Sequence, residues 1–162
     1  LDLIDELKEK ARAEGLWNFF LPPGSDPQGK FGPGLTNLEY TGLCEIMGRV
    51  WWAPEVFNCN APDTGNMELL HLFGTDEQKR RWLPGMLSGD QIGDYSLSEA
   101  QAGSDAAALR CAAIVTDGGY VLNGSKAWIT HGGRADFYTL FARTGEGSKG
   151  VSCFLVPGDH PA

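Results

Sequence analysis

Two short stretches of the sequence hold side chains that could contact a polar, flat ligand. In residues 95–105 (YSLSEAQAGSD), an expected strand ends at a hydroxyl and a carboxylate, Ser98 and Glu99. In residues 126–133 (KAWITHGG), Trp128 and Thr130 stand two positions apart before a glycine pair. On a strand these two side chains would share a face, because side chains alternate along a strand. One interpretation is a flat, hydrogen-bonding ligand against that face; the other is a core tryptophan beside a threonine that favours strands.

The loop after Glu99 belongs to the same candidate site. It reads Ala-Gly-Ser-Asp over residues 102–105. Gly103 lets the backbone approach a ligand closely, and exposed N–H groups in such a turn can bind an anion. A turn without a ligand is the alternative. The glycines do not form G-x-G-x-x-G inside a βαβ unit, so a nicotinamide Rossmann site is not supported, and no P-loop is present.

The elements that must position these side chains change character near residue 90. The first half predicts helices, with a Pro- and Gly-rich loop over residues 21–33. Pro84 is expected to end or kink the last of these helices. Helices are expected to begin near residue 2, at the capping boxes Thr36–Glu39 and Thr75–Gln78, and at residues 61–63.

From about residue 91 the hydrophobic period changes to two, which predicts strands. Two hairpin signals, residues 117–119 (Asp-Gly-Gly) and 123–124 (Asn-Gly), separate them. The fold class is therefore α+β: an all-helical N-terminal domain over residues 1–90, then a small, incomplete antiparallel β-barrel or sandwich over residues 91–162. Short strands are expected over residues 92–97, 109–116, 120–123, 126–130, 137–143 and 151–156.

Composition narrows the classes of protein. The 162 residues carry a formal net charge of −8, which disfavours a nucleic-acid binder, because phosphate contacts need clustered Lys and Arg. No apolar run is long enough to span a membrane, and no secretory signal is visible. The cysteines lack zinc-knuckle or C-x-x-C spacing, so no metal site is expected and reduced, core or near-core thiols in an intracellular protein are predicted. They are Cys44, Cys59, Cys111 and Cys153.

The combination of motifs is more specific than either one alone. LSEAQAGSD, followed by YVLNGSKAWITHGGRAD and FYTLFARTGEGSKGVSCFLVPG, resembles the acyl-CoA dehydrogenase family of flavoproteins, and the helix LFGTDEQKRRWLPGMLSGD fits the same family. The resemblance covers nearly all of the chain. Ser98 replaces the usual Thr but keeps the hydroxyl, and His131 stands where Asn is usual. Ala100 and Gln101 replace a frequent Pro-Gly pair, and Ser96 stands where a small residue, often Ala, Gly or Cys, is usual.

The resemblance implies a role for each matching residue. Tyr95, Leu97 and Ser98 would line FAD, with the Ser98 hydroxyl donating toward the pyrimidine edge. Trp128 would pack its indole against the isoalloxazine ring beside Ile129, and Thr130 would place its hydroxyl near flavin N5. Gly103 and Ser104 would form a turn shared by flavin and substrate, with Ser104 near the pantetheine arm.

The family's reaction is the α,β-dehydrogenation of an acyl-CoA thioester, with electrons passed from FAD to an electron-transfer flavoprotein. The resemblance places the catalytic base in a C-terminal helical region that this sequence lacks, so these 162 residues alone are expected to be inactive. The full-length protein is expected to be a homodimer or homotetramer, in the cytoplasm of a bacterium or in the mitochondrial matrix. A flavin oxidase or monooxygenase on the same scaffold, or a non-catalytic binding module, stays open as an alternative.

Several residues that invite a catalytic role have simpler interpretations. Glu99 could be a general base, but it is expected to be structural, because the family takes its base from a later segment. His71 is expected to be a packing or surface residue, and His131 a turn residue beside the flavin edge. The cations of the second half are expected to be mostly solvated, with one of them available to hold a phosphate: Lys126, Arg134, Arg143 and Lys149.

Overall fold

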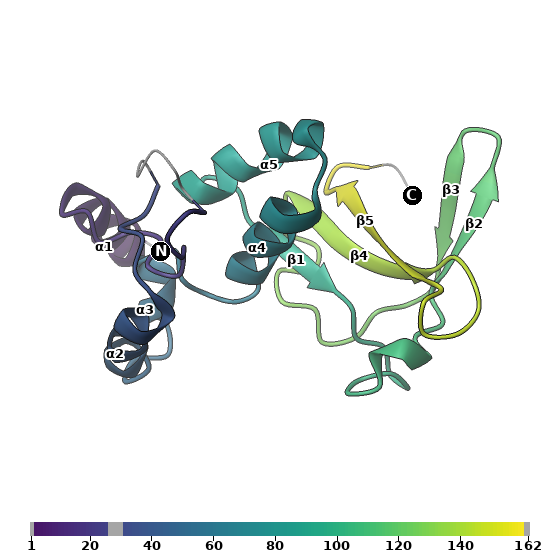
Figure 1. The fold of residues 1–162 in the computed structure, drawn as a ribbon, viewed down its shortest axis with the longest axis horizontal. Helices are drawn as coiled ribbons and strands as arrows, with labels where there is room; N and C mark the ends of the chain where they lie inside the picture. The colour runs from purple at the N-terminus through teal and green to yellow at the C-terminus, as the bar shows by residue number, and fades with distance from the viewer. Residues whose placement is uncertain (1, 26–30, 161–162) are drawn as a thin grey trace. The chain divides into compact units, whose positions relative to one another are not determined.

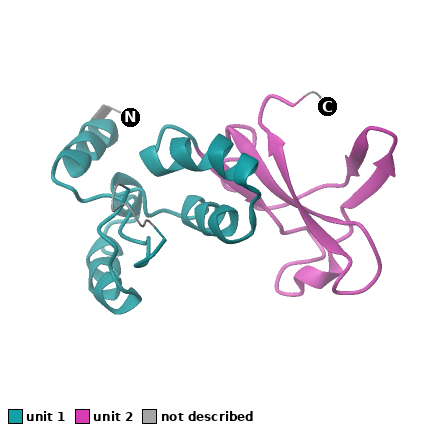
Figure 2. Cartoon of the chain, turned by 45° about the horizontal axis from the view of Figure 1, so that its top comes forward, with its two compact units in different colours: residues 1–91 teal, residues 92–162 magenta. Residues whose placement is uncertain are grey.

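The computed structural model describes residues 2–25 and 31–160 (Figure 1). The chain divides into two compact units, residues 1–91 and residues 92–162 (Figure 2). Among the residues that the structure describes, no helix combines the length and the apolar character needed to cross a membrane.

The first unit is helical, as expected. Its longer helices begin near the residues that the sequence indicated, whereas a four-residue helix from Ala53 was not expected. The first helix and this short helix pack together around Ala11, Trp17 and Val56. The Pro- and Gly-rich loop is described only outside residues 26–30. The helices are α1 (Asp2–Ala13), α2 (Asn37–Met47), α3 (Ala53–Val56), α4 (Asp63–Phe73) and α5 (Asp76–Ser88).

Both predicted capping boxes are present. The hydroxyl of Thr36 accepts from the N–H of Glu39, and the Glu39 carboxylate accepts from the N–H of Thr36. Thr75 and Gln78 repeat this exchange at the start of α5. Each box satisfies donors that a helix N-terminus leaves open, which explains why the two helices start at these residues.

Of the two outcomes expected for Pro84, that it ends its helix is wrong. Helix α5 continues to Ser88 and ends at Gly89, whose φ of 78° is left-handed. Proline removes one backbone hydrogen bond from a helix interior. The buried side chains of Trp82 and Met86, on either side of Pro84, offset that loss by packing into the core of the unit.

The second unit is a small sheet, in agreement with the expected β half (Figure 1). The sheet is mixed and not purely antiparallel, because β1 and β2 each pair with β4 in parallel. The neighbours β4 and β5 are antiparallel, and so are β2 and β3. The elements are β1 (Gly93–Ser96), the 3-10 turn η1 (Ala106–Ala108), β2 (Ala112–Thr116), β3 (Gly119–Asn123), β4 (Phe137–Arg143) and β5 (Val151–Pro157).

One hairpin signal was right and the other wrong. Asp117 and Gly118 form the tight turn between β2 and β3, where Thr116 pairs with Gly119. No strand directly follows Asn123-Gly124, because residues 126–130 are irregular backbone instead of the expected strand. Two features accompany this path: Gly124 lies directly against Cys111, and Trp128 has a φ of 62°, outside the strand region.

The four cysteines are all free thiols, as expected. Cys59 and Cys111 are buried, and burial raises the pKa of both. Cys44 and Cys153 are exposed as residues, so the expectation of a core or near-core position holds for only two of the four.

Candidate cofactor site

The structure brings the two motifs together. The N–H of Ala127 donates to the carbonyl of Ser98 over 2.9 Å. The ammonium of Lys126 donates to the carbonyl of Leu97 over 3.1 Å, although the two residues are 29 positions apart. The segment that leaves β1 and the irregular segment after β3 therefore lie side by side within the second unit.

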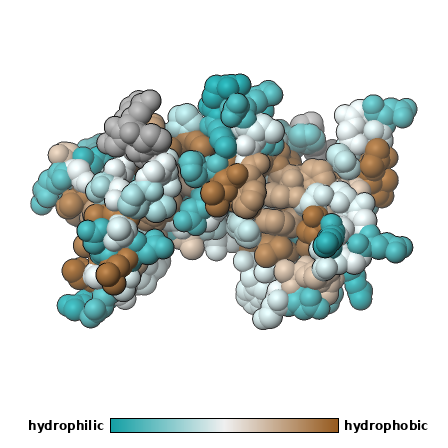
Figure 3. Space-filling model, viewed as in Figure 1, coloured by the Kyte–Doolittle hydropathy of each residue, from teal (hydrophilic) through white to brown (hydrophobic). Residues whose placement is uncertain are grey.

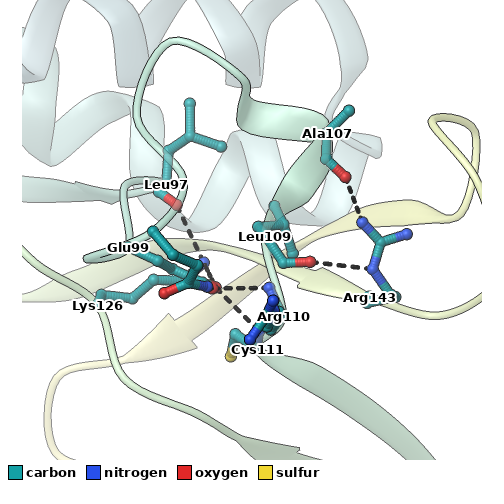
Figure 4. A network of polar contacts seen from close by, with 9 residues as sticks. Leu97, Glu99, Ala107, Leu109, Arg110, Cys111, Lys126 and Arg143 are labelled. Atoms are coloured by element: carbon teal, nitrogen blue, oxygen red, sulfur yellow. Dashed lines mark hydrogen bonds and ion pairs between the residues drawn. The ribbon is translucent and has the colours of Figure 1, made fainter.

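Glu99 is the centre of the polar network in Figure 4, which joins these segments to the start of β2. Its buried carboxylate accepts from the N–H of Arg110 over 2.7 Å and from the N–H of Cys111 over 2.9 Å. It also accepts from the amide of Gln101 over 2.6 Å and from the ammonium of Lys126 over 2.8 Å.

These contacts decide the protonation of Glu99. Burial alone would raise the pKa of the carboxyl, but the Lys126 ammonium, the two backbone N–H groups and the Gln101 amide lower the pKa to about 2. A carboxylate held ionised by four donors is a poor proton acceptor near neutral pH. The structure thus favours the structural interpretation of Glu99 over a general base.

Two cations differ from the solvated charges that the sequence suggested. The Lys126 side chain is only 9% exposed and pairs with Glu99. The Arg143 guanidinium donates to the carbonyls of Leu109, Ala107, Gly145 and Gly147 (Figure 4 shows the first two). Both cations are committed to internal contacts and are poorly placed to receive a phosphate.

Trp128 does not fill a core in this structure. Its side chain is 95% exposed, although tryptophan has a large apolar surface. Its φ of 62° lies in the left-handed region, which is costly for a residue with a bulky side chain. The backbone on either side is fixed, by the bond from Ala127 to Ser98 and by the N–H of Gly132, which donates to Ile129 over 3.2 Å.

Neighbours of Trp128 continue this exposed surface. Thr130 is exposed, and Ile129 is half-buried. Trp128 and Thr130 do not share the face of a strand, because the segment that carries them is irregular. His131 anchors its far end through Nδ1, which lies 3.1 Å from the carbonyl of Gly93. A carbonyl only accepts, so this contact requires the proton on Nδ1.

The loop after β1 presents small groups to solvent. Glu99 and Ala102 close it with two backbone hydrogen bonds of 3.0 Å, which leave Gly103 and Ser104 exposed. A Cβ added to Gly103 would meet no atom within 4 Å, so the chain itself does not require glycine there. A ligand lying close to the backbone would explain why a residue without a side chain stands at this position.

The end of β1 and the two residues after it contribute the remaining predicted residues. Tyr95 is half-buried, with its ring 5.1 Å from the ring of Phe141, so part of its surface packs within the unit. Leu97 and Ser98 are also half-buried. Asp94 directly precedes these predicted residues, and the sequence did not single it out. It is fully buried, and burial raises the pKa of its carboxyl against the opposing effects of Ser96, Thr139 and His131.

The residues present fit a flat, hydrogen-bonding cofactor such as FAD. An exposed indole in a costly backbone conformation offers a broad face for a ring system, and the hydroxyls of Ser98 and Thr130 lie on the two joined segments. Sequence reasoning missed the pairing of Lys126 with Glu99. No local pattern signalled it, because the two residues meet only after the chain has folded.

Comparisons with known proteins agree with the motifs. Residues 4–90 match the family model of the acyl-CoA dehydrogenase N-terminal domain, and residues 95–162 match that of the middle domain. The chain is 54% identical over 129 residues to acyl-CoA dehydrogenase family member 10 of Mus musculus, covering 79% of this chain and 12% of that protein.

Solved structures extend the likeness to the fold. A structure described as an acyl-CoA dehydrogenase from Mycobacterium abscessus has a TM-score of 0.86 and 42% identity over 98% of this chain and 39% of its own. A glutaryl-CoA dehydrogenase from Mycobacterium smegmatis in complex with FADH2 has a TM-score of 0.70 and 28% identity, over 96% and 38%.

The chain thus spans well under half the length of each of these proteins. Within that span the similarity is continuous, since the two matched domains follow one another with four residues between them, 91–94. From these matches, and from motifs that the structure places side by side, this chain belongs to the acyl-CoA dehydrogenase family.

Proposed function

We propose that the full-length protein is an FAD-dependent acyl-CoA dehydrogenase and that this chain supplies one wall of its flavin site. The observation that carries the proposal is the exposed, left-handed Trp128, joined to Ser98 through the Ala127–Ser98 hydrogen bond. FAD, when bound, accepts the β-hydrogen of the acyl chain as hydride while the α-proton leaves. Family membership and the relative solved with FADH2 support this assignment.

The chain's own residues would hold and orient the reactants. The indole of Trp128 would stack on the flavin ring system and keep water from that face. The hydroxyl of Ser98 would donate to the pyrimidine edge, where negative charge develops, and that of Thr130 would hold N5. Gly103 and Ser104 would let the thioester arm pass close to the backbone.

The remaining parts of the reaction are assigned outside this chain. Glu99 is saturated with donors, so the base that removes the α-proton would come from another part of the full-length protein. The electron acceptor is proposed to be an electron-transfer flavoprotein, and the active form a homodimer or homotetramer. A cytoplasmic or mitochondrial-matrix location belongs to the same proposal.

Purified full-length protein tests the proposal. It should be yellow or take up FAD on reconstitution, and acyl-CoA should bleach the flavin band under anaerobic conditions. The reduced protein should reoxidise slowly in air and rapidly with an electron-transfer flavoprotein. Rapid reoxidation by oxygen would instead make it an oxidase or monooxygenase, and a colourless protein that takes up no FAD would make it a binding module.

A further inference from the structure

Lys126 is a buried cation whose contacts bracket Ser98. Its side chain is 9% exposed, and its ammonium donates to the carbonyl of Leu97 over 3.1 Å and to the Glu99 carboxylate over 2.8 Å. The next residue, Ala127, donates its N–H to Ser98 over 2.9 Å. Three consecutive residues, 97–99, are thus held by two consecutive residues, 126 and 127.

These contacts replace a strand ladder. Residues 126–130 form no regular pairing, so the distance between the Ser98 segment and Trp128 is not set by repeated backbone bonds. Of the described hydrogen bonds between residues 97–99 and 126–130, one is backbone to backbone and the other two end on Lys126. Without the Lys126 side chain, a single bond would join the two halves of the candidate site.

Stability alone does not explain an ion pair at this position. Charges removed from water lose hydration, and a buried pair often stabilises a fold no more than apolar side chains of the same size would. The geometry of a buried pair, by contrast, is specific, because the ammonium must meet both the carbonyl and the carboxylate. Such a contact is suited to fixing the positions of neighbouring groups.

We propose that Lys126 is a positioning residue for the cofactor. It sets the place of the Ser98 hydroxyl relative to Trp128 and Thr130, and thereby the tightness and the polarity of the flavin environment. The proposal rests on the proposed FAD site. Lys126 touches neither substrate nor flavin in this role and acts through the segments that it joins.

Arg143 supplies a matched control in the same unit. It also uses one cationic side chain to bind backbone carbonyls, including those of Leu109 and Gly147, but its guanidinium donates to no carbonyl of residues 97–99 or 126–130 among the residues that the structure describes. Lys126→Met and Arg143→Met should both lower the melting temperature of the full-length protein. Only Lys126→Met should change the cofactor site.

The experiment compares FAD binding and flavin absorbance in the full-length wild type and the two variants. Lys126→Met should raise the Kd for FAD about tenfold, roughly the equivalent of one charged hydrogen bond, and shift the visible flavin band. Arg143→Met should leave the Kd within about twofold and the band in place, a difference that corresponds to well under 1 kcal/mol.

A double variant separates the positioning role of Lys126 from its role as the counter-charge of Glu99. Glu99→Gln with Lys126→Met removes the unpaired carboxylate, so it should regain thermal stability relative to Lys126→Met while still binding FAD weakly. It also carries the test if Lys126→Met does not fold. Wild-type affinity and spectrum in the Lys126 variants, or an equal loss in Arg143→Met, would overturn the positioning role alone. Wild-type protein that takes up no FAD would overturn the proposed function and, with it, this inference.

Discussion

At the scale of single residues, Trp128 and Glu99 lie in opposite environments within the candidate site. Trp128 is 95% exposed and adopts a backbone conformation that its bulk disfavours. Glu99 is buried and bound by four donors. The first has surface left for a ligand, whereas the second has no acceptor capacity to spare, so the two residues are expected to respond to mutation in different ways.

Substitution of Trp128 should affect the cofactor and not the fold. In the full-length protein, Trp128→Ala should raise the Kd for FAD about tenfold to a hundredfold, through the loss of aromatic contact area. Its unfolding free energy should change by less than about 0.5 kcal/mol, because the side chain makes few internal contacts. Titration with FAD, followed by flavin fluorescence, measures the first effect.

Trp51→Ala is the matched control, since Trp51 is a 91% exposed tryptophan in the first unit. It should leave the affinity for FAD unchanged. Equal flavin content and an equal spectrum in Trp128→Ala and the wild type would remove Trp128 from the site.

Thr130 should act on the reaction more than on binding. Thr130→Val keeps the shape of the side chain but removes the hydroxyl proposed to lie near N5. Flavin reduction by acyl-CoA should slow by about tenfold to a hundredfold, since a preorganised donor is lost. Stopped-flow absorbance measures the rate of flavin reduction. The control is Thr116→Val, which changes an exposed threonine on β2 and should leave this rate unaltered. An unaltered reduction rate in Thr130→Val would contradict the role.

Glu99 should make the unfolding free energy of the protein depend on pH in the acidic range. Its pKa is lowered from an ordinary 4.5 to about 2, so the folded state binds protons less readily than the unfolded state. The contribution is fully present above about pH 4.5 and is lost as the pH falls toward about 2. It amounts to roughly 3 kcal/mol.

Glu99→Gln tests this through urea unfolding at a series of pH values. The wild type should be more stable than the variant at neutral pH, and the difference should shrink as the pH falls below about 4.5. A difference that stays constant over this range would show that Glu99 does not titrate as its contacts indicate.

At the scale of elements, the connection from β3 to β4 decides where the candidate site lies. Its sequence has an Asn-Gly pair, which is typical of a hairpin turn, followed by a segment that is predicted to be a strand. The segment after this pair forms neither a hairpin nor a strand. Gly124 lies so close to Cys111 that an added Cβ would come within 2.6 Å of the Cys111 Cα. This close approach leads the chain to Lys126 and Ala127, which then bind the segment that leaves β1.

Gly124→Ala should therefore destabilise the protein by about 2 kcal/mol or more, because backbone would have to move. Gly118→Ala is the control: a Cβ there would meet nothing within 4 Å, so the change should be within about 0.5 kcal/mol. Urea unfolding curves of the two variants provide the comparison. Equal stability of the two would mean that the contact with Cys111 does not guide this segment.

At the scale of the whole molecule, large apolar side chains are exposed on both units. Figure 3 shows apolar residues on the face of β4 and β5. A groove of about 660 Å³ in the second unit is lined by aromatic and aliphatic side chains of β3, β4 and β5. In the first unit, Leu38 and Trp51 are 85% and 91% exposed.

The 162 residues expressed alone should consequently be inactive and prone to association. Acyl-CoA should not bleach added FAD in their presence, because the proposed base lies outside this chain, and light scattering should rise with concentration. The full-length protein should reduce its flavin and stay in solution. Turnover of acyl-CoA by the short chain would place the base within these residues and reopen the case for Glu99.

The sequence by itself determined the features that depend on neighbours along the chain. Capping boxes at Thr36 and Thr75, the turn at Asp117-Gly118 and the change from helical to strand periodicity all involve residues a few positions apart. Their energies are local, so the same residues give the same structure in most surroundings. The two motifs also indicated the family, because their order and spacing are properties of the sequence.

Only the tertiary structure decided how the residues of the candidate site are brought together. The irregular path of residues 126–130, the exposed Trp128 and the pairing of Lys126 with Glu99 depend on contacts between distant segments. A buried charge must find a partner wherever the fold supplies one, and that requirement outweighs the weak local preference of five residues for a strand. Tertiary packing also keeps Pro84 within a helix, because the burial of Trp82 and Met86 outweighs the cost of one lost hydrogen bond.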